Sequence, residues 1–237
     1  MYEDDDKTDG SSRRHRGAKS LGEDAEALLG ECDAAGAGIG AVAQEQRLRE
    51  WAEANGHVVP QEDWEHLKVV SAMTAEHEVR YRPSDNRAVK KTWPGMFGFV
   101  PKLIDGAWKP APATPLEYLR RQKLQNVIFN DDVRVEGLMT SDQPSMLIGQ
   151  PSGGLSIVIS QPWMKGLDDK APHPSEKQIA AYLQSRGFSL LFSSFLGWRN
   201  ATTGVVVLDA KPDNFILTER GILPIDLLLT HTQPDET

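Results

Sequence analysis

The sequence predicts an α+β fold, in which strands and helices lie mostly in separate stretches of the chain. Three observations support this prediction. A helical pattern follows a polar N-terminal leader, a strand–turn–strand pattern surrounds Pro83 to Asn86, and apolar runs separated by turns fill the part from Phe188 onward. Separate runs of strands and of helices are typical of the α+β class.

The bulk composition disfavours several classes of protein. The chain has 237 residues, enough for one two-lobed domain or two small ones, and a formal net charge of -8. This acidic balance disfavours a nucleic-acid partner. No apolar run approaches the ~20 residues of a membrane span, so we expect no membrane partner. The one cysteine, Cys32, cannot form a disulfide within the chain, and we expect a cytoplasmic protein.

The N-terminal part divides into a polar and a helical stretch. Residues 1–22 mix opposite charges with serine and glycine, so we expect a disordered leader. Residues 23–60 are predicted to form a helical extension. Its second helix is predicted over 41–55, where apolar residues recur at helical spacing, and Gly56 follows as a stop signal.

Residues 61–162 are predicted to hold a small sheet and one helix. The stretch 62–75 fits either a helix or a helix that passes into a strand. Two strands are predicted within 78–92, because the turn-forming residues 83–86 separate two short runs of strand formers. A stretch rich in proline and glycine, 93–115, follows without a predicted element.

The one helix of this part is predicted over 114–129. Thr114 and Glu117 have the spacing of a capping box, with Pro115 at the first helical position. Strands are predicted at 133–139 and 155–160.

Residues 163–237 are predicted to form a second unit. Ser175 and Gly187 delimit a short helix as its N-cap and its C-terminal stop. Apolar runs separated by turn residues then predict strands at 188–196, 205–208, 215–217 and 222–228.

Four polar residues in this last part suggest a metal and phosphate site. Asp209, Lys211 and Asn214 share one loop, and Asp226 interrupts an apolar run. An ionised carboxylate in such a run costs several kcal/mol unless it is paired or bound to a metal. A tight turn between the two short strands would bring Asn214 near Asp226, and oxygen ligands of this kind suit Mg²⁺.

Lys90 is the upstream candidate for this site. In a strand, Ala88 and Lys90 share one face, whereas Lys91 points to the other. Each of these residues also has an explanation without any site. Lys90 could be solvated on an edge strand, residues 209–214 could be ordinary turn residues, and Asp226 could be hydrogen-bonded in the core. In an unrelated fold, Lys90 and Asp226 would lie far apart.

The order of these residues resembles the protein-kinase superfamily. Its catalytic loop has the form D-x-K-P-x-N and is followed by a hairpin and a metal-binding aspartate. Residues 78–226 are also similar to the compact kinase-like domains of bacterial polyvalent proteins from mobile elements and phages, through A-V-K-K-T, T-P-L-E-Y-L and D-A-K-P-D-N. The resemblance implies a reduced two-lobed kinase-like fold, with 61–162 and 163–237 as its lobes and the helical extension preceding them.

The resemblance also implies a role for each candidate residue. Asp209 takes the position of the catalytic base, and Lys211 neutralises the transferred phosphate. Asn214 and Asp226 hold Mg²⁺, and Lys90 reaches the phosphates of ATP.

The helix at 114–129 takes the position of the kinase regulatory helix. Its partner for Lys90 would be Glu117, which its place in the capping box also explains, or the uncharged Gln125. Adenine would meet the strand end at 158–161, and we expect Ile159 and Gln161 to offer it backbone groups.

The function implied is a Mg-ATP-dependent phosphotransferase that acts on an unknown small-molecule or protein acceptor. The sequence departs from the kinase pattern in several ways. No glycine-rich loop precedes Lys90, Val207-Leu208 replaces His-Arg, and the residues after Asp226 are Leu227 and Leu228. Thr237 ends the sequence shortly afterwards, so an ordinary protein kinase is not expected. The alternative is a catalytically degenerate kinase-like module that binds a nucleotide or acts as a scaffold.

Overall fold

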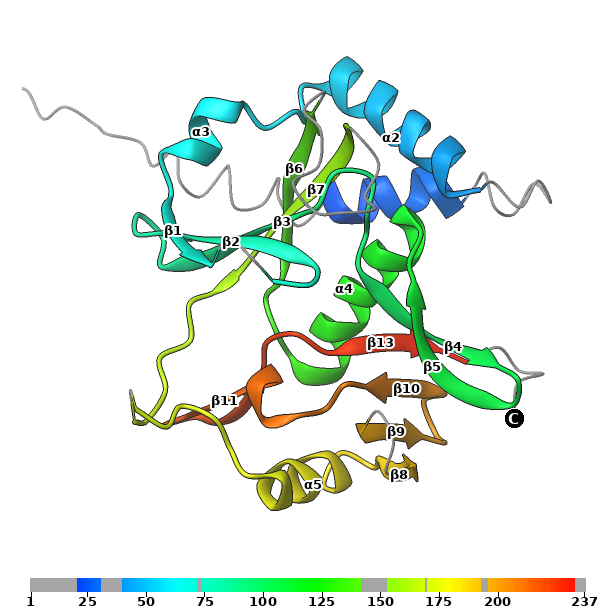
Figure 1. Cartoon of the computed structure of the whole chain (residues 1–237), viewed down its shortest axis with the longest axis vertical. Helices are drawn as coiled ribbons and strands as arrows, with labels where there is room; N and C mark the ends of the chain where they lie inside the picture. The colour runs from blue at the N-terminus through cyan, green and yellow to red at the C-terminus, as the bar shows by residue number, and fades with distance from the viewer. Residues whose placement is uncertain are drawn as a thin grey trace, which may run out of the picture.

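The computed structural model describes residues 21–30, 40–71, 74–141, 153–168, 170–192 and 196–232. Within these ranges the protein has the predicted α+β class, with antiparallel sheets and few helices (Figure 1). The leader expected at 1–22 lies almost wholly outside the described residues, and so does Cys32.

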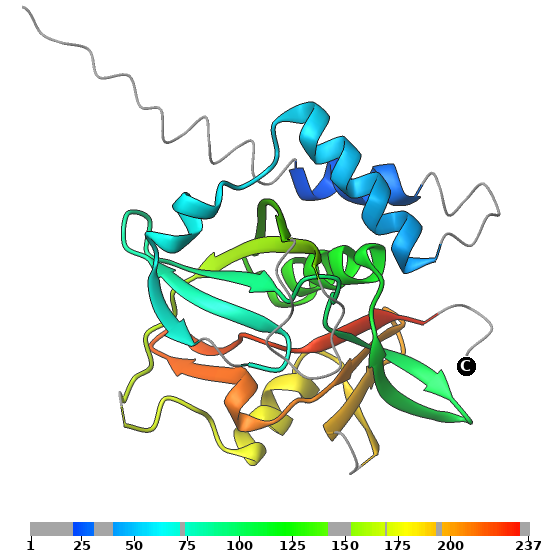
Figure 2. The same ribbon diagram turned by 45° about the horizontal axis from the view of Figure 1, so that its top comes forward.

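The N-terminal helices form as predicted. Residues 21–30 are helical, and α2 spans Ala41–Asn55. Gly56 ends α2 in a left-handed conformation, with φ 70°, and its N–H donates to the carbonyl of Ala52. The two helices lie side by side along one edge of the molecule in both views (Figures 1 and 2). Among the described residues, no helix is both long and apolar enough to cross a bilayer.

The first sheet has five strands in the order β1-β2-β3-β7-β6. Their bounds are Lys68–Ser71, His77–Arg82, Arg87–Thr92, Gly154–Pro162 and Arg134–Ser141. The short helix α3 (Gln61–Glu65) precedes β1, so the open stretch at 62–75 is a helix that passes into a strand. The β2–β3 hairpin and the strands β6 and β7 are confirmed.

A further hairpin occupies the stretch for which no element was predicted. β4 (Phe99–Ile104) pairs with β5 (Ala107–Pro112) through a two-residue turn, Asp105-Gly106, with φ of 53° and 75°. Aspartate–glycine is a strong signal for such a turn. The prolines of this stretch argued against strands, but a hairpin outside the main sheets tolerates them because its edges need no ladder hydrogen bonds.

Helix α4 (Pro115–Phe129) packs against both halves of the protein. Its capping box forms as predicted between Thr114 and Glu117. Leu116 and Leu119 belong to a core with the first sheet and the N-terminal helices, whereas Phe129 belongs to a core with the C-terminal strands. Figure 1 shows α4 between the two groups of strands.

The C-terminal half contains α5 (Glu176–Gln184) and a four-stranded sheet in the order β13-β10-β9-β8. The bounds of these strands are Leu228–His231, Val205–Leu208, Gly197–Asn200 and Ser189–Phe192. The hairpin β4–β5 packs against this sheet, where Trp108 contacts the core formed by Val206, Leu208 and Leu228.

The loop after β10 leads into a short hairpin. A 3-10 turn, η2 (Pro212–Asn214), precedes β11 (Phe215–Thr218), which pairs with β12 (Gly221–Pro224). The prediction of one continuous strand over 222–228 was wrong, because β12 ends at Pro224 and the next strand begins only at Leu228. Asp226 therefore lies in the bend between β12 and β13 and not within a strand.

Candidate functional site

A cavity of about 920 Å³ opens between the first sheet and the loops that follow β10 and β12. Apolar side chains make most of its wall. The polar residues that line it include Glu76, Lys90, Gln161, Asp209, Lys211, Asp213, Asn214 and Asp226. The structure therefore brings five of the predicted site residues to one cavity together with Gln161.

Asp209 is held by its own loop. It follows β10 in a left-handed backbone conformation, with φ 58°, which aspartate tolerates better than most residues. Its Oδ2 accepts a 2.8 Å hydrogen bond from the Asn214 amide and lies 3.2 Å from Lys211 Nζ. Its Oδ1 has no hydrogen-bond partner among the described residues. One carboxylate oxygen is thus fixed and the other remains available.

Asn214 is buried at the start of the short hairpin. Its Nδ2 donates both to the carbonyl of Asp209, at 2.7 Å, and to the carboxylate. This pattern assigns the amide orientation and leaves Oδ1 without a partner among the described residues. The carbonyl of Asn214 accepts a 2.9 Å hydrogen bond from the N–H of Ile225. The hairpin therefore brings Asn214 beside Asp226, as the sequence predicts.

Lys90 reaches the same place from the first sheet. Its strand, β3, lies between β2 and β7, so Lys90 is not on an edge strand. Ala88 and Lys90 both line the cavity, as their shared face predicts. Nζ of Lys90 donates a 2.6 Å hydrogen bond to the carbonyl of Ile225. Lys90 and Asp226 consequently lie close together despite their distance in the sequence.

Arg121 is a central residue of the site that the sequence analysis missed. It projects from α4 with a side chain that is only 3% exposed. Nη1 binds both carboxylate oxygens of Glu76, at 2.7 and 3.0 Å, and Nη2 binds Oδ1 of Asp226 at 3.0 Å. Its remaining bonds go to backbone carbonyls, from Nε to Leu227 and from Nη1 to Phe99. The guanidinium therefore lies between two carboxylates.

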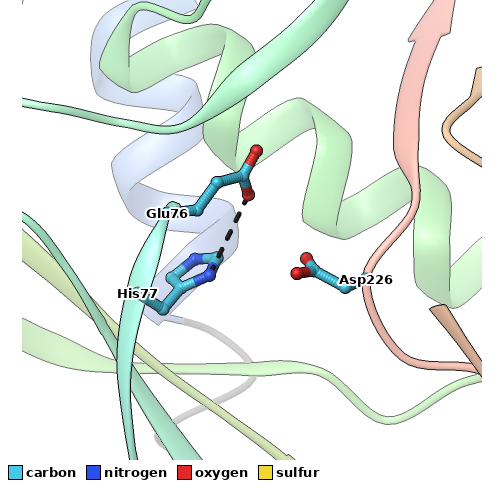
Figure 3. Close-up of side chains that lie close together, drawn as sticks. All are labelled: Glu76, His77 and Asp226. Atoms are coloured by element: carbon cyan, nitrogen blue, oxygen red, sulfur yellow. Dashed lines mark ion pairs between the residues drawn. The ribbon is translucent and has the colours of Figure 1, made fainter. Parts of the chain in front are cut away.

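The buried residues Glu76 and His77 lie next to Arg121 and Asp226 (Figure 3). Glu76 directly precedes β2, His77 is its first residue, and Asp226 faces them from the bend after β12. Burial lowers the pKa of His77 to about 3, so the ring is neutral at neutral pH. Its Nε2 is 2.9 Å from the hydroxyl of Tyr118, whereas its Nδ1 is 3.9 Å from Glu76. The contact drawn in Figure 3 is thus not a salt bridge at neutral pH.

Glu76, His77 and Asp226 are residues of types that can bind a metal. One possible ligand atom from each lies within 4.8 Å of the others. However, Arg121 already contacts both carboxylates at hydrogen-bonding distance. A divalent ion between them would have to displace this guanidinium, so the positive charge at this position comes from the protein itself.

The two carboxylates of this group differ in their surroundings. Burial raises the pKa of Glu76 above its ordinary value, and Arg121 only partly opposes this. Burial would also raise the pKa of Asp226, but the positive charge of Lys90 and then those of its other neighbours, Arg121 and Lys211 among them, hold it below its ordinary value. The Asp226 side chain is 37% exposed, in keeping with its place on the cavity wall. Of these two carboxylates, Asp226 is therefore the one that can meet a ligand while it is itself ionised.

The expected partners of Lys90 are placed elsewhere. Glu117 forms an ion pair with Lys102, at 2.8 Å, and accepts from the N–H of Thr114 in its capping box. Gln125 donates to Asp131 and to the carbonyl of Pro224. Neither forms a hydrogen bond or an ion pair with Lys90. Position 117 lies in the first turn of α4, whereas position 121, one turn later, faces the cavity loops.

Ile159 and Gln161, the two residues expected to meet adenine, differ in their position relative to the cavity. Ile159 pairs with Lys90 on one side and with Val135 on the other, so neighbouring strands flank its backbone on both sides. Its side chain is buried in the first core, and it does not face the cavity. Gln161, near the end of β7, does line the cavity. The expectation for Ile159 was wrong because β7 is an inner strand.

Sequence signals for the missed residues were weak. Arg121 lies three residues after Tyr118 and four before Gln125, so it continues the buried stripe of α4 as a charge among buried residues. Glu76 precedes a strand without any motif around it.

Comparisons with known proteins add no identification. No family model matches the chain, and no curated protein or solved structure matches it either.

Proposed function

We propose that the protein is a kinase-like, Mg-ATP-dependent phosphotransferase that acts on an unknown small-molecule or protein acceptor. One observation carries the proposal. Lys90 on β3, Asp226 in the bend after β12, and Asp209, Lys211 and Asn214 in the loop after β10 line the same cavity. Two cations, a carboxylate with a free oxygen and two oxygen ligands are the groups that phosphoryl transfer requires.

The cavity suits a nucleotide in size and in polarity. Its volume of about 920 Å³ falls within the ~300–1,000 Å³ range of small-molecule sites. Val79, Ala88 and Trp163 provide apolar wall near Gln161, where a base could pack. Lys90 and Lys211 lie toward the acidic loops, where phosphates would meet positive charge. The arrangement supports a base at the β7 end and phosphates at the Asp226 end.

The residues present also fit Mg²⁺. Asn214 keeps its amide oxygen free, and Asp226 keeps one carboxylate oxygen that Arg121 does not bind. Hard oxygen ligands of this kind, with phosphate oxygens and water, are the usual set for Mg²⁺. When bound, the ion would neutralise charge on the phosphates.

The chain's own groups would do the remaining work. Lys90 would bind the phosphates, and Lys211 would offset negative charge on the group being transferred. Asp209 would orient the acceptor hydroxyl with its free oxygen and accept its proton, while Asn214 and Lys211 hold its other oxygen. The proposal includes a reduced two-lobed kinase-like architecture, with α4 in contact with both sets of strands.

A kinase-like module that binds a nucleotide without transferring phosphate is the second candidate. Glu76 favours it, because this acid lines the cavity beside Asp226, close to where anionic phosphates would lie. The two candidates share the nucleotide site and differ only in turnover.

The test of the site is thermal unfolding with ATP, with and without Mg²⁺. Saturating Mg-ATP should raise the melting temperature by about 5–10 °C, since ligand at 100 times Kd adds about 2.7 kcal/mol. Asp226→Asn should remove most of this shift. Asp105→Asn, an equivalent change in an exposed turn outside the cavity, should leave the shift intact. No shift with the unaltered protein would refute the nucleotide site.

Turnover separates the two candidates. The phosphotransferase predicts release of ADP, or labelling of the protein by ATP, that Asp209→Asn abolishes while nucleotide-dependent stabilisation persists. Stabilisation without any ADP release across a panel of hydroxyl acceptors would favour the binding module.

A further inference from the structure

Asp226 presents only one free carboxylate oxygen to the cavity. Its Oδ1 accepts a 3.0 Å hydrogen bond from Nη2 of Arg121. No other described residue forms a hydrogen bond with either of its oxygens. The carboxylate is therefore engaged on one side by a cation that belongs to the protein.

This geometry bears on how many metal ions the site can hold. In protein kinases, two Mg²⁺ ions share the metal-binding aspartate and the loop asparagine. An aspartate holds two dications best when each ion binds a different oxygen, because two dications on one oxygen repel each other more strongly. Here one oxygen is occupied by Arg121, and a second dication beside it would lie against a guanidinium. Asn214 offers one metal ligand, its amide oxygen, which the hydrogen bonds from its nitrogen to Asp209 leave free.

We propose that Arg121 is a built-in cation that takes the place of a second metal ion, so that the site binds a nucleoside triphosphate with one divalent ion. The inference rests on the proposed function and specifies its ligand. Asn214 and the free oxygen of Asp226 hold the one ion. Arg121 is a positioning residue, since it acts on the ligand through Asp226.

The environment of Arg121 keeps it in place. Its guanidinium makes two contacts with Glu76, two with backbone carbonyls and one with Asp226. A guanidinium stays charged at any ordinary pH, so this cation cannot be removed by deprotonation. If it moved away, Glu76 would be left as an unpaired buried carboxylate. The ion pair with Glu76 therefore anchors the charge that faces Asp226.

The alternative use of this region is a metal site made by Glu76, His77 and Asp226. Such a site would bind an ion without any nucleotide, and it would require Arg121 to leave. The two arrangements differ in whether the protein binds Mn²⁺ in the absence of nucleotide.

The direct experiment counts Mn²⁺ on the full chain. Protein-bound Mn²⁺ is measured by gel filtration in buffer that contains Mn²⁺, with and without saturating nonhydrolysable ATP analogue, so that Mn²⁺ on free analogue is the same in the protein peak and in the baseline. We expect one Mn²⁺ per chain with the analogue, and none below millimolar concentration without it. Two nucleotide-dependent ions would overturn the inference and leave the proposed function standing. Binding without nucleotide would overturn it in favour of the acidic metal site.

Failure of the proposed function looks different. If the analogue neither stabilises the protein nor promotes Mn²⁺ binding, the nucleotide site itself is refuted, and the inference falls with it.

Variants test the part assigned to Arg121. Arg121→Gln should free Oδ1 of Asp226 and raise the count with the analogue from one Mn²⁺ to two. Arg120→Gln changes the neighbouring residue, on the exposed side of α4, and should keep the count at one Mn²⁺. Because Glu76 would be unpaired in the single variant, the double variant Glu76→Gln/Arg121→Gln is measured beside it. A folded variant that binds the analogue and still holds one ion would overturn the role of Arg121, and the count on the unaltered protein is independent of variant folding.

Discussion

Nζ of Lys90 lies 2.6 Å from the carbonyl oxygen of Ile225, which joins the first sheet to the bend that carries Asp226. The two residues are 135 positions apart in the sequence. The ammonium group donates one of its three hydrogens to this carbonyl, which leaves two for a ligand. The same contact thus orients Lys90 and keeps it beside the cavity.

Replacing Lys90 by Gln should weaken nucleotide binding. A hydrogen bond to a charged group contributes about 1.5–3 kcal/mol, so we expect Kd for ATP to rise about 10- to 100-fold. Lys91→Gln is the matched control, because Lys91 faces the other side of the sheet and pairs with Glu78. Isothermal titration calorimetry measures both. Equal losses in the two variants would contradict the assignment of Lys90.

Arg121 and Glu76 should be coupled in stability. Removing one member of a buried ion pair costs about 3–5 kcal/mol, because the remaining charge is left unpaired. We expect this loss for Arg121→Met in urea unfolding. The double variant with Glu76→Gln should recover part of it. A double variant that is less stable than the single one would contradict the pairing seen in the structure.

The hairpin β4–β5 should depend on Trp108 for its attachment to the C-terminal sheet. Trp108 is buried against Val206, Leu208 and Leu228. Trp108→Ala should lower the free energy of unfolding by about 3–5 kcal/mol. Leu103 lies on the same hairpin but is 40% exposed. Leu103→Ala should therefore change the free energy of unfolding by no more than about 0.5 kcal/mol. Similar effects for both would mean that the hairpin does not dock as described.

Glu136 gives a pH dependence that is independent of the cavity. Burial opposes its ionisation, but hydrogen bonds from Arg82 and Ser160 lower the pKa below its ordinary 4.5. A carboxyl with a lowered folded-state pKa stabilises the protein above pH 4.5, and this contribution disappears as the pH falls through the folded-state value.

The test compares the unaltered protein with Glu136→Gln in urea at several pH values. The difference in unfolding free energy should be about 1.5–3 kcal/mol at pH 7 and should shrink steadily below pH 4.5. A difference that stays constant down to pH 3 would show that Glu136 is not ionised and paired in the folded protein.

Sequence reasoning succeeded where the determining contacts are local. The capping box of Thr114 and Glu117 joins residues three positions apart, and Gly56 ends α2 through a bond to Ala52. The loop from Asp209 to Asn214 is likewise closed by hydrogen bonds within five positions. Such bonds depend on residue type and spacing, which the sequence states directly.

Sequence reasoning failed mainly where packing between distant segments of the chain decided the outcome. Glu117 and Arg121 lie one turn apart on α4, and only the packing of the helix determines which of them reaches Asp226. Ile159 was expected at a ligand because its strand was identified, but whether that strand is inner or outer depends on the order of the whole sheet. The hairpin at 99–112 was missed for a local reason, because a stretch rich in proline and glycine gave no clear strand pattern.

The sequence by itself determined the α+β class, most of the helices and strands, and the loop that offers Asp209, Lys211 and Asn214. Only the tertiary structure decided that Arg121 and Glu76 share the site with Asp226. These three residues are separated by 45 and 105 positions, and they meet because α4 packs against both sheets. No local pattern encodes that meeting, since it depends on how two separate cores pack against opposite ends of one helix.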